Sequence, residues 1–146
     1  MQTTKLLDDY APTRDIVDTA TAAGHFSVLL NAMKAAQVTE TLRGHGPYTL
    51  FAPTDAAFRK VTRDTINSLL KDRAKLAGIL NAHVVRGKIM AKQLASGPLP
   101  TLQGQDLLLI VSLDGVRVGN ARIMKTDIEA ANGVIHSIDT VLMPLP

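Results

Sequence analysis

The chain has 146 residues, which is long enough for one domain with a hydrophobic core of its own. Its 46% hydrophobic and 20% charged residues are ordinary for a globular protein and exclude a disordered chain, and no run of about 18 apolar residues predicts a membrane span. The net charge of +3 is modest, and the lack of cysteine excludes disulfides and thiolate chemistry.

The N-terminal third is predicted to be helical. The first ten residues have weak periodicity and no apolar signal-peptide core, so we expect a loose terminus on a cytosolic protein or on a chain that has lost its export signal. A short helix is predicted from Thr13, ended by Gly24. A second apolar stripe with helical spacing runs from Phe26 to Met33, and residues 38–42 fit one more turn.

Residues 48–58, YTLFAPTDAAF, are predicted to form a strand, a sharp turn and the start of a helix. Residues 48–52 are apolar and favour β-structure, and Pro53 has no amide hydrogen to donate to a sheet. Such a junction can carry chemistry, but the glycine-rich or Gly-x-Ser-x-Gly patterns of phosphate loops and nucleophile elbows are missing. We therefore interpret it as architectural.

Five residues of this junction are expected to define the fold: Phe51, Pro53, Thr54, Asp55 and Phe58. Thr54 suits an N-cap, where its hydroxyl accepts a helical amide, and Asp55 follows in the first turn, where the helix dipole favours a negative charge. A cation ligand or an acid is the functional alternative for Asp55. Phe51 and Phe58 are expected to be buried anchors.

Two further helices are predicted before residue 84. The first has Thr62 as a cap, and the second begins at Asp72. The side chains expected to point inward are Ile66, Leu69, Leu70, Leu76, Ile79 and Leu80. His83 lies on the stripe of the second helix and is expected to be buried.

The segment from residue 59 to residue 92 is strongly basic. It holds nine basic and two acidic residues, a net charge of +7, whereas the rest of the chain carries −4. Such a segment favours an acidic partner or is a solvated helical face. It contains no aromatic residue, which disfavours nucleic acid because single-strand binders stack bases on aromatic rings.

The second half is predicted to be β-structure. Residues 97–100, GPLP, are interpreted as a hard break, and close turn signals follow at Gly104, Asp114-Gly115, Gly119-Asn120 and Asn132-Gly133. The strand-like runs between them are residues 106–113, 116–118, 121–128 and 134–143. Helices first and antiparallel strands afterwards predict an α+β fold. The strand at 48–52 is expected to join the late strands in one core.

Three stretches of the chain resemble the fasciclin-like (FAS1) domain family, in the family's order. They are residues 46–58 (GPYTLFAPTDAAF), residues 80–89 (LNAHVVRGKI) and residues 132–144 (NGVIHSIDTVLMP). The resemblance spans roughly residues 13–144. It implies a wedge of two β-sheets with several helices, and it divides the chain into an N-terminal extension, 1–12, and a single domain, 13–146.

The resemblance also implies a non-enzymatic, extracytoplasmic adhesion or protein-interaction module without a cofactor. Its partner would be a protein or a cell-surface or matrix component, including acidic polysaccharide. Two segments with receptor-binding roles in animal members match His83 and the pair Asp127-Ile128, whereas Ala82, Arg86, Lys125 and Thr126 depart from the family's pattern.

These candidate sites have structural alternatives. His83 has no second ligand at metal-binding spacing and fits a hydrogen-bonded core histidine. Asp127 is either part of an exposed recognition edge or merely solvated, and Ile128 is either on that edge or in the core.

His136 stands near Ser137 and Asp139, and together with Asp55 this group suggests a catalytic triad. Alternation along a strand turns both neighbours away from His136, so we assign His136 to the fold. His25 and His45 are isolated, so no metal site is predicted. The alternative function is a small-molecule or polyanion-binding domain that uses the segment from Arg59 to Lys92.

Overall fold

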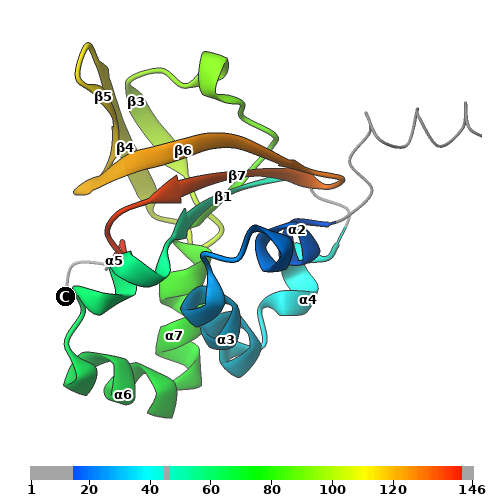
Figure 1. The fold of residues 1–146 in the computed structure, drawn as a ribbon, viewed down its shortest axis with the longest axis vertical. Helices are drawn as coiled ribbons and strands as arrows, with labels where there is room; N and C mark the ends of the chain where they lie inside the picture. The colour runs from blue at the N-terminus through cyan, green and yellow to red at the C-terminus, as the bar shows by residue number, and fades with distance from the viewer. Residues whose placement is uncertain (1–14, 45–46, 143–146) are drawn as a thin grey trace, which may run out of the picture.

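The computed structural model describes residues 15–44 and 47–142, which form an α+β fold (Figure 1). Its helices are α2 (Ile16–Ala23), α3 (Ser27–Ala36), α4 (Thr39–Leu42), α5 (Asp55–Arg59), α6 (Arg63–Lys71), α7 (Arg73–Asn81) and the short 3-10 helix η1 (Ala91–Gln93). All the α-helices precede residue 82, as predicted. Within the described residues no helix is long and apolar enough to cross a membrane.

The strands form one hydrogen-bonded series in the order β2-β1-β7-β6-β5-β4-β3. They are β1 (Tyr48–Pro53), β2 (Val84–Arg86), β3 (Gly97–Pro100), β4 (Asp106–Ser112), β5 (Gly115–Val118), β6 (Ala121–Ala130) and β7 (Gly133–Ile138). The early strand β1 pairs in parallel with β7, the last strand, and all other pairs are antiparallel. The prediction that residues 48–52 join the late strands is confirmed.

Two sheets share β6 and close into a wedge. One contains β2, β1, β7 and β6, and the other continues from β6 through β5 and β4 to β3. The free ends of the series meet, because Val85 bridges to Thr101 and the Leu102 amide donates to the Val84 carbonyl at 2.9 Å. The wedge therefore has an inside and an outside.

Alternation along β1 separates two hydrophobic cores. Leu50 and Ala52 face the helices, whereas Phe51 faces the inside of the wedge. Figure 1 shows the helices gathered against β1 and β7, whereas β3, β4 and β5 project away from them. The outer side of the second sheet is consequently left without a helical cover.

The predicted helix caps at Thr54 and Thr62 are confirmed, and Asp72, predicted as the start of the next helix, also acts as its N-cap. Each side chain accepts the amide three residues further on, at 3.1 to 3.2 Å. Asp15, which the sequence analysis did not single out, caps α2 in the same way at 2.8 Å.

Two expectations about strands are wrong. Residues 97–100 do not break the chain but form β3, paired with β4. β3 is the edge strand of the series, and an edge tolerates proline because one row of its amides needs no partner strand. The last strand ends at Ile138 rather than Met143, since Asp139 and Thr140 form a bend.

Two side chains predicted to be buried are not. Leu70 is 52% exposed at the end of α6, while Leu69 turns into the core. Phe58 is only half-buried, and Ala57 beside it has no exposed surface. Phe51 is fully buried, as predicted.

Asn132 was predicted only as part of a turn, but its side chain also joins several elements of the fold. Its side chain accepts the Ile16 amide at 2.9 Å and donates to the carbonyls of Leu42 and Gly44 at 2.6 and 2.8 Å. Gly133 next to it pairs in β7, and a Cβ there would collide with the Tyr48 carbonyl. This corner therefore joins α2, α4, β1 and β7.

Some predicted features lie outside the described residues. They are the loose first ten residues, the helix start at Thr13, the boundary between residues 12 and 13, His45, and the last two residues of the third family-like stretch, 143–144.

Candidate functional site

His83 lies in the turn between α7 and β2 and has no exposed surface. Its Nδ1 donates to the Ile79 carbonyl at 2.8 Å, and its Nε2 accepts the Leu142 amide at 2.8 Å. Burial lowers the pKa of His83 to about 4, against the smaller raising effect of the Ile79 carbonyl. The expected burial is confirmed, and a side chain without exposed surface makes no direct contact with a partner.

His136 is buried inside the wedge, where its ring packs against Phe51 with a centroid distance of 5.7 Å. Its Nε2 donates to the Ile89 carbonyl at 2.7 Å, and its Nδ1 accepts the Asp127 amide at 3.2 Å. Burial lowers its pKa, opposed by the Ile89 carbonyl and by the charge of Asp127. Both ring nitrogens are occupied, which fits a structural role.

The residues of the suggested triad do not converge. Ser137 accepts the Lys125 amide at 2.9 Å. Asp139 accepts the Arg122 amide at 2.8 Å. Neither is bonded to His136, so this cluster supplies no activated nucleophile.

Asp55 caps a helix other than its own. Its Oδ1 accepts the Val28 amide at 2.8 Å in the first turn of α3. The N-cap position of α3 is Phe26, whose side chain cannot accept a hydrogen bond. Asp55 occupies the first turn of α5, as predicted, and its bond to the Val28 amide in addition holds the start of α5 against the start of α3.

Asp127 and Ile128 lie where β6 bulges away from regular pairing with β7. Asp127 is exposed with a φ of 59°, and its Oδ1 accepts the Ala91 amide at 2.7 Å at the start of η1. Ile128 is half-buried against the helix-side core. Asp127 is thus exposed and bonded rather than merely solvated.

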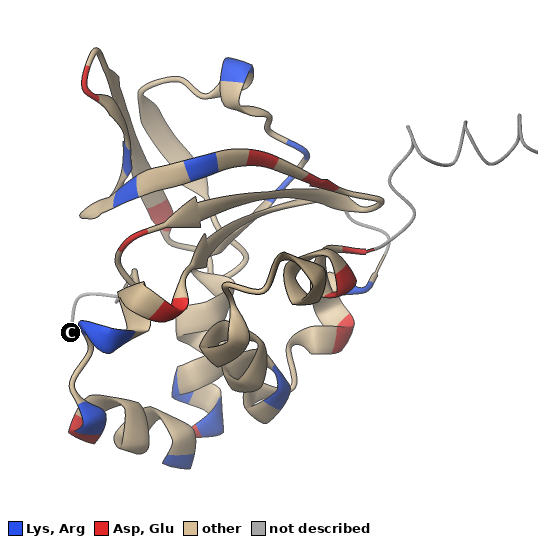
Figure 2. Cartoon of the chain, viewed as in Figure 1, with Lys and Arg blue, Asp and Glu red and all other residues tan. Residues whose placement is uncertain are grey.

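The nine basic residues of the 59–92 segment are all exposed but do not form one surface. Figure 2 shows one group along the ends of α5, α6 and α7 and another around β2 and η1. In the second group Lys88 forms an ion pair with Glu129 at 3.3 Å. No group of three or more histidine, aspartate or glutamate side chains in residues 15–44 and 47–142 could hold a metal ion.

An apolar patch covers the β4–β5 hairpin and the adjoining part of β6. Of the six large hydrophobic side chains that are well exposed in the described chain, five lie here and the sixth is Leu70. We call these five the hairpin patch: Leu108, Ile110, Val111, Leu113 and Met124. Alternation along β4 puts Leu108 and Ile110 on the outer side of the sheet and Val111 on the side of the buried Leu109. Exposed apolar side chains gathered on one element indicate an interaction surface.

Two arginines adjoin the hairpin patch on the outer side of the sheet. Arg117 on β5 is directly opposite Ile110 on β4 and Arg122 on β6. Both arginines are exposed, and neither is in an ion pair with the acids of the described chain. Like charges at directly opposed positions of a sheet repel each other, so an acidic group from outside would stabilise this row.

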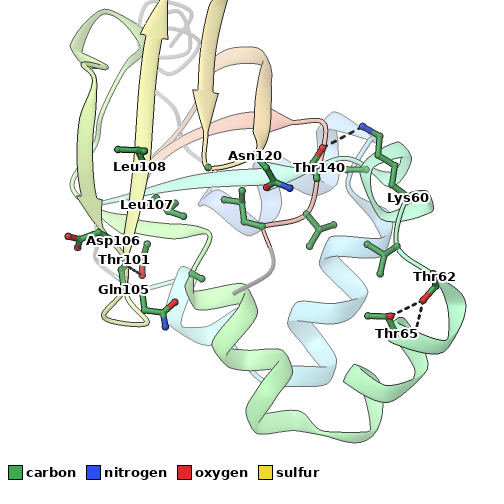
Figure 3. A pocket seen from close by; sticks show the side chains of 16 residues that line it. Lys60, Thr62, Thr65, Thr101, Gln105, Asp106, Leu107, Leu108, Asn120 and Thr140 are labelled. Carbon is green, nitrogen blue, oxygen red and sulfur yellow. Dashed lines mark hydrogen bonds between the residues drawn. The ribbon is translucent and has the colours of Figure 1, made fainter. Parts of the chain in front are cut away.

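A cleft of about 940 Å³ adjoins the hairpin patch at Leu108 (Figure 3). One wall is the connection from α5 to α6, and the other is the start of β4 together with the β5–β6 turn. Of the nine basic residues in the 59–92 segment, only Lys60 lines it. No local sequence pattern indicates this cleft, because its walls come from distant parts of the chain.

Comparisons with known proteins agree on one family. A model of the Fasciclin domain matches residues 24–144. Protein sll1483 of Synechocystis sp. (strain ATCC 27184 / PCC 6803 / Kazusa) is 44% identical over 131 residues, covering 88% of this chain and 73% of that protein. Cell surface glycolipoprotein MPB83 of Mycobacterium bovis is 42% identical over 107 residues, covering 73% of this chain and 48% of that protein.

One solved structure is similar over most of the described fold. It is a FAS1 domain pair from the insect cell adhesion molecule fasciclin I, with a TM-score of 0.76 at 20% identity over 91% of this chain and 52% of that chain. At this identity the likeness bears on the fold alone. The α+β fold expected from the three sequence stretches is confirmed.

Proposed function

The chain belongs to the fasciclin domain family, and from this premise we propose that it is a non-enzymatic adhesion or protein-interaction module that acts outside the cytoplasm. One of its relatives is a cell surface glycolipoprotein. The module would comprise residues 13–146, with residues 1–12 as an extension. The bonded, buried state of His136 and the separate bonds of Ser137 and Asp139 support a non-catalytic role.

The observation that carries the proposal is the hairpin patch. A typical soluble monomer exposes apolar side chains singly, whereas five well-exposed large ones gather here on one hairpin and its neighbouring strand. The helices that cover the other outer side of the wedge do not reach this one. We assign the patch to the binding of a partner protein.

The adjoining arginines define the chemistry of that partner. Arg117 and Arg122 extend the row that begins at Ile110. The surface therefore presents apolar side chains beside two cations that form no ion pair with any residue the structure describes. Its complement is an apolar protein surface bordered by carboxylates. Arginine suits this role because its planar fork pairs with a carboxylate through two hydrogen bonds. In this proposal Asp127 and Ile128, on the same strand as Met124, lie at the rim.

The test is attachment to an immobilised domain. Cells of the source organism, matrix proteins and acidic polysaccharides are each applied to surfaces coated with the native domain or with heat-denatured domain. The native domain is expected to retain cells or protein above the denatured control. Replacing Ile110 and Met124 together by serine is expected to weaken retention roughly tenfold or more, the range for two truncated interface anchors.

Leu70→Ser is the matched control, because Leu70 is comparably exposed but lies on α6. It should retain the partner as the native domain does. Equal losses for Leu70→Ser and for the double variant would remove the hairpin patch from the proposal. Retention no better than on denatured domain, for every partner applied, would contradict the proposed function itself.

A further inference from the structure

The cleft of Figure 3 is a separate site with its own chemistry. It is formed by the α5–α6 connection, the β3–β4 and β5–β6 turns, and residues 140–142. Its volume of about 940 Å³ lies within the range of known ligand pockets, roughly 300 to 1,000 Å³. The hairpin patch shares only Leu108 with it.

The floor of the cleft is apolar and held in place by buried contacts. Ala57, Val141 and Leu142 are buried there, and Leu107 adds a half-buried aliphatic side chain. The Leu142 amide donates to Nε2 of His83 at 2.8 Å, so the buried histidine fixes the last part of the floor. Through this bond the buried His83 is linked to a surface site. His83 is a positioning residue, because it holds Leu142 in the floor of the cleft.

The rim offers hydrogen-bonding groups that the protein itself does not use. The side-chain amides of Gln105 and Asn120 border the cleft from opposite turns, and neither has a hydrogen-bond partner in residues 15–44 and 47–142. A side-chain amide presents two donors and an acceptor, which complements a peptide group. The Thr65 hydroxyl, by contrast, already pairs with Thr62 at 2.7 Å.

One cation stands at the rim. The Lys60 ammonium lies 3.5 Å from the Thr140 hydroxyl and in no ion pair among the described residues. Figure 3 shows Lys60 at the rim near Thr140, and Asn120 on the side facing it. Asp106 also borders the cleft, but its carboxylate extends away from Leu107 and from the floor. The Asp139 carboxylate accepts a hydrogen bond from the Thr140 hydroxyl at 3.1 Å and interacts electrostatically with Lys60. Lys60 is the only cation among the described residues that line the cleft.

We propose that this cleft binds an extended acidic peptide segment of a partner protein. A carboxylate of the segment pairs with Lys60, its backbone amides pair with Asn120 and Gln105, and its aliphatic side chains pack on the floor around Leu107 and Val141. This assignment rests on the proposed function, since it names a second contact of the same interaction module. None of the described residues that line the cleft is aromatic, so they offer no platform on which sugar rings or nucleobases stack.

The probe is a library of random short peptides displayed on phage and selected on the immobilised full chain. Enriched peptides are expected to share an aspartate or glutamate at one position. Binding of a selected peptide should fall at least tenfold for Lys60→Glu and for Asn120→Ala. Renewed selection on Lys60→Glu should replace the shared acid by lysine or arginine, because a carboxylate then stands where the ammonium was.

Arg63→Glu is the matched control, since Arg63 is an exposed cation at the start of α6 that does not line the cleft. It should bind the selected peptide within about twofold of the native chain, as should the Ile110→Ser/Met124→Ser variant. If no peptide is enriched, or if Arg63→Glu loses as much as Lys60→Glu, the inference is overturned. Lys60-dependent binding of an acidic oligosaccharide, without any selected peptide, would overturn it in favour of a saccharide site.

The two proposals fail separately. If the Ile110→Ser/Met124→Ser variant loses attachment of cells or protein and no peptide is selected, the proposed function stands. The proposal that the cleft binds a peptide is then contradicted. If the domain selects peptides whose binding depends on Lys60 but retains no cell or protein, the proposal for the cleft stands. Adhesion through the hairpin patch is then contradicted.

Discussion

His83 is a fully buried titratable side chain that cannot take up a proton without losing a bond. Its Nε2 accepts the Leu142 amide, so protonation there would place two donors face to face. Burial in a low-dielectric interior disfavours the charged ring as well. The native fold therefore holds His83 neutral at pH values where the unfolded chain already binds a proton.

The first prediction is a loss of stability in mild acid. The unfolded chain protonates His83 near its ordinary pKa of 6.5 and the folded chain only near pKa 4, so stability is fully present above about pH 6.5 and declines as the pH falls toward 4. The full difference is worth about 3 kcal/mol. His136, whose pKa is also lowered, acts in the same direction. Urea denaturation across this range measures the effect.

His83→Gln isolates this contribution. The variant should be less stable than the native chain at neutral pH, and its stability should decline less between pH 6.5 and pH 4. His25→Gln is the control, because His25 is exposed in the turn between α2 and α3. A slope that is unchanged by His83→Gln, or equally flattened by His25→Gln, would contradict the assignment.

Phe51 and Phe58 test how much of the fold-defining junction is core. Phe51 has no exposed surface and packs on His136, whereas Phe58 is half-buried at the edge of the helix-side core. Phe51→Ala should cost about 3 to 5 kcal/mol of unfolding free energy. Phe58→Ala should cost clearly less, because fewer of its contacts are removed from solvent. Chemical denaturation of both variants compares them, and a cost under about 1 kcal/mol for Phe51→Ala would place it outside the core.

At the scale of elements, α5 and α3 are joined by one carboxylate. Asp55 accepts the Val28 amide, and its own amide donates to the His25 carbonyl at 2.9 Å. Asp55→Ala would leave an unsatisfied amide in the first turn of α3 and should cost about 1 to 2 kcal/mol. Hydrogen exchange of the Val28 amide should accelerate together with the loss in melting temperature.

Asp64→Ala is the matched control for Asp55→Ala. Asp64 also occupies the first turn of a helix, but it is exposed and forms no side-chain hydrogen bond within the described residues. Its removal should cost less than about 0.5 kcal/mol. Similar losses in the two variants would show that Asp55 acts through the dipole of its own helix rather than across to α3.

The predictions from sequence succeeded where an element depends on its own residues. The caps at Thr54 and Thr62, the start of a helix at Asp72 and the order of helices and strands follow from local chemistry, and all are present. The contact from Asp55 to Val28 spans 27 residues and that from Asn132 to Ile16 spans 116, so no local pattern indicates them. Pro98 and Pro100 suggested a break because the edge position that tolerates them depends on the whole sheet.

The candidate sites were harder to predict for a related reason. Residues 106–113 are recognisable as a strand, but which of their side chains stay exposed depends on where the helices pack. The +7 segment is visible in the sequence, yet the fold distributes it over separate places and brings only Lys60 to the cleft. Family resemblance pointed to His83, which the structure buries beneath that cleft.

For the whole molecule, the central fact is that the last strand lies between earlier parts of the chain. β7 pairs with β1 on one side and with β6 on the other, and all six of its residues are buried. The core inside the wedge likewise combines Phe51 and Val85 with Leu109 and Ile138. Neither half of the chain can complete a core without the other.

The prediction at this scale concerns two fragments, residues 1–96 and residues 97–146. Each should be unfolded alone, because the first contains β1 without β7 and the second contains β7 without β1 or any of the described α-helices. Far-ultraviolet circular dichroism and the dispersion of amide signals in NMR spectra measure this directly. A control on the intact chain tests whether a local disturbance of a surface loop is enough to unfold the protein. A short Gly-Ser insertion between the exposed Gln103 and Gly104 should cost under about 1 kcal/mol of unfolding free energy, because lengthening a surface loop adds little closure entropy. A cooperatively folded 1–96 fragment would show instead that the helices and β1 form a core that does not need β7, and the wedge would then be an addition to a smaller helical unit.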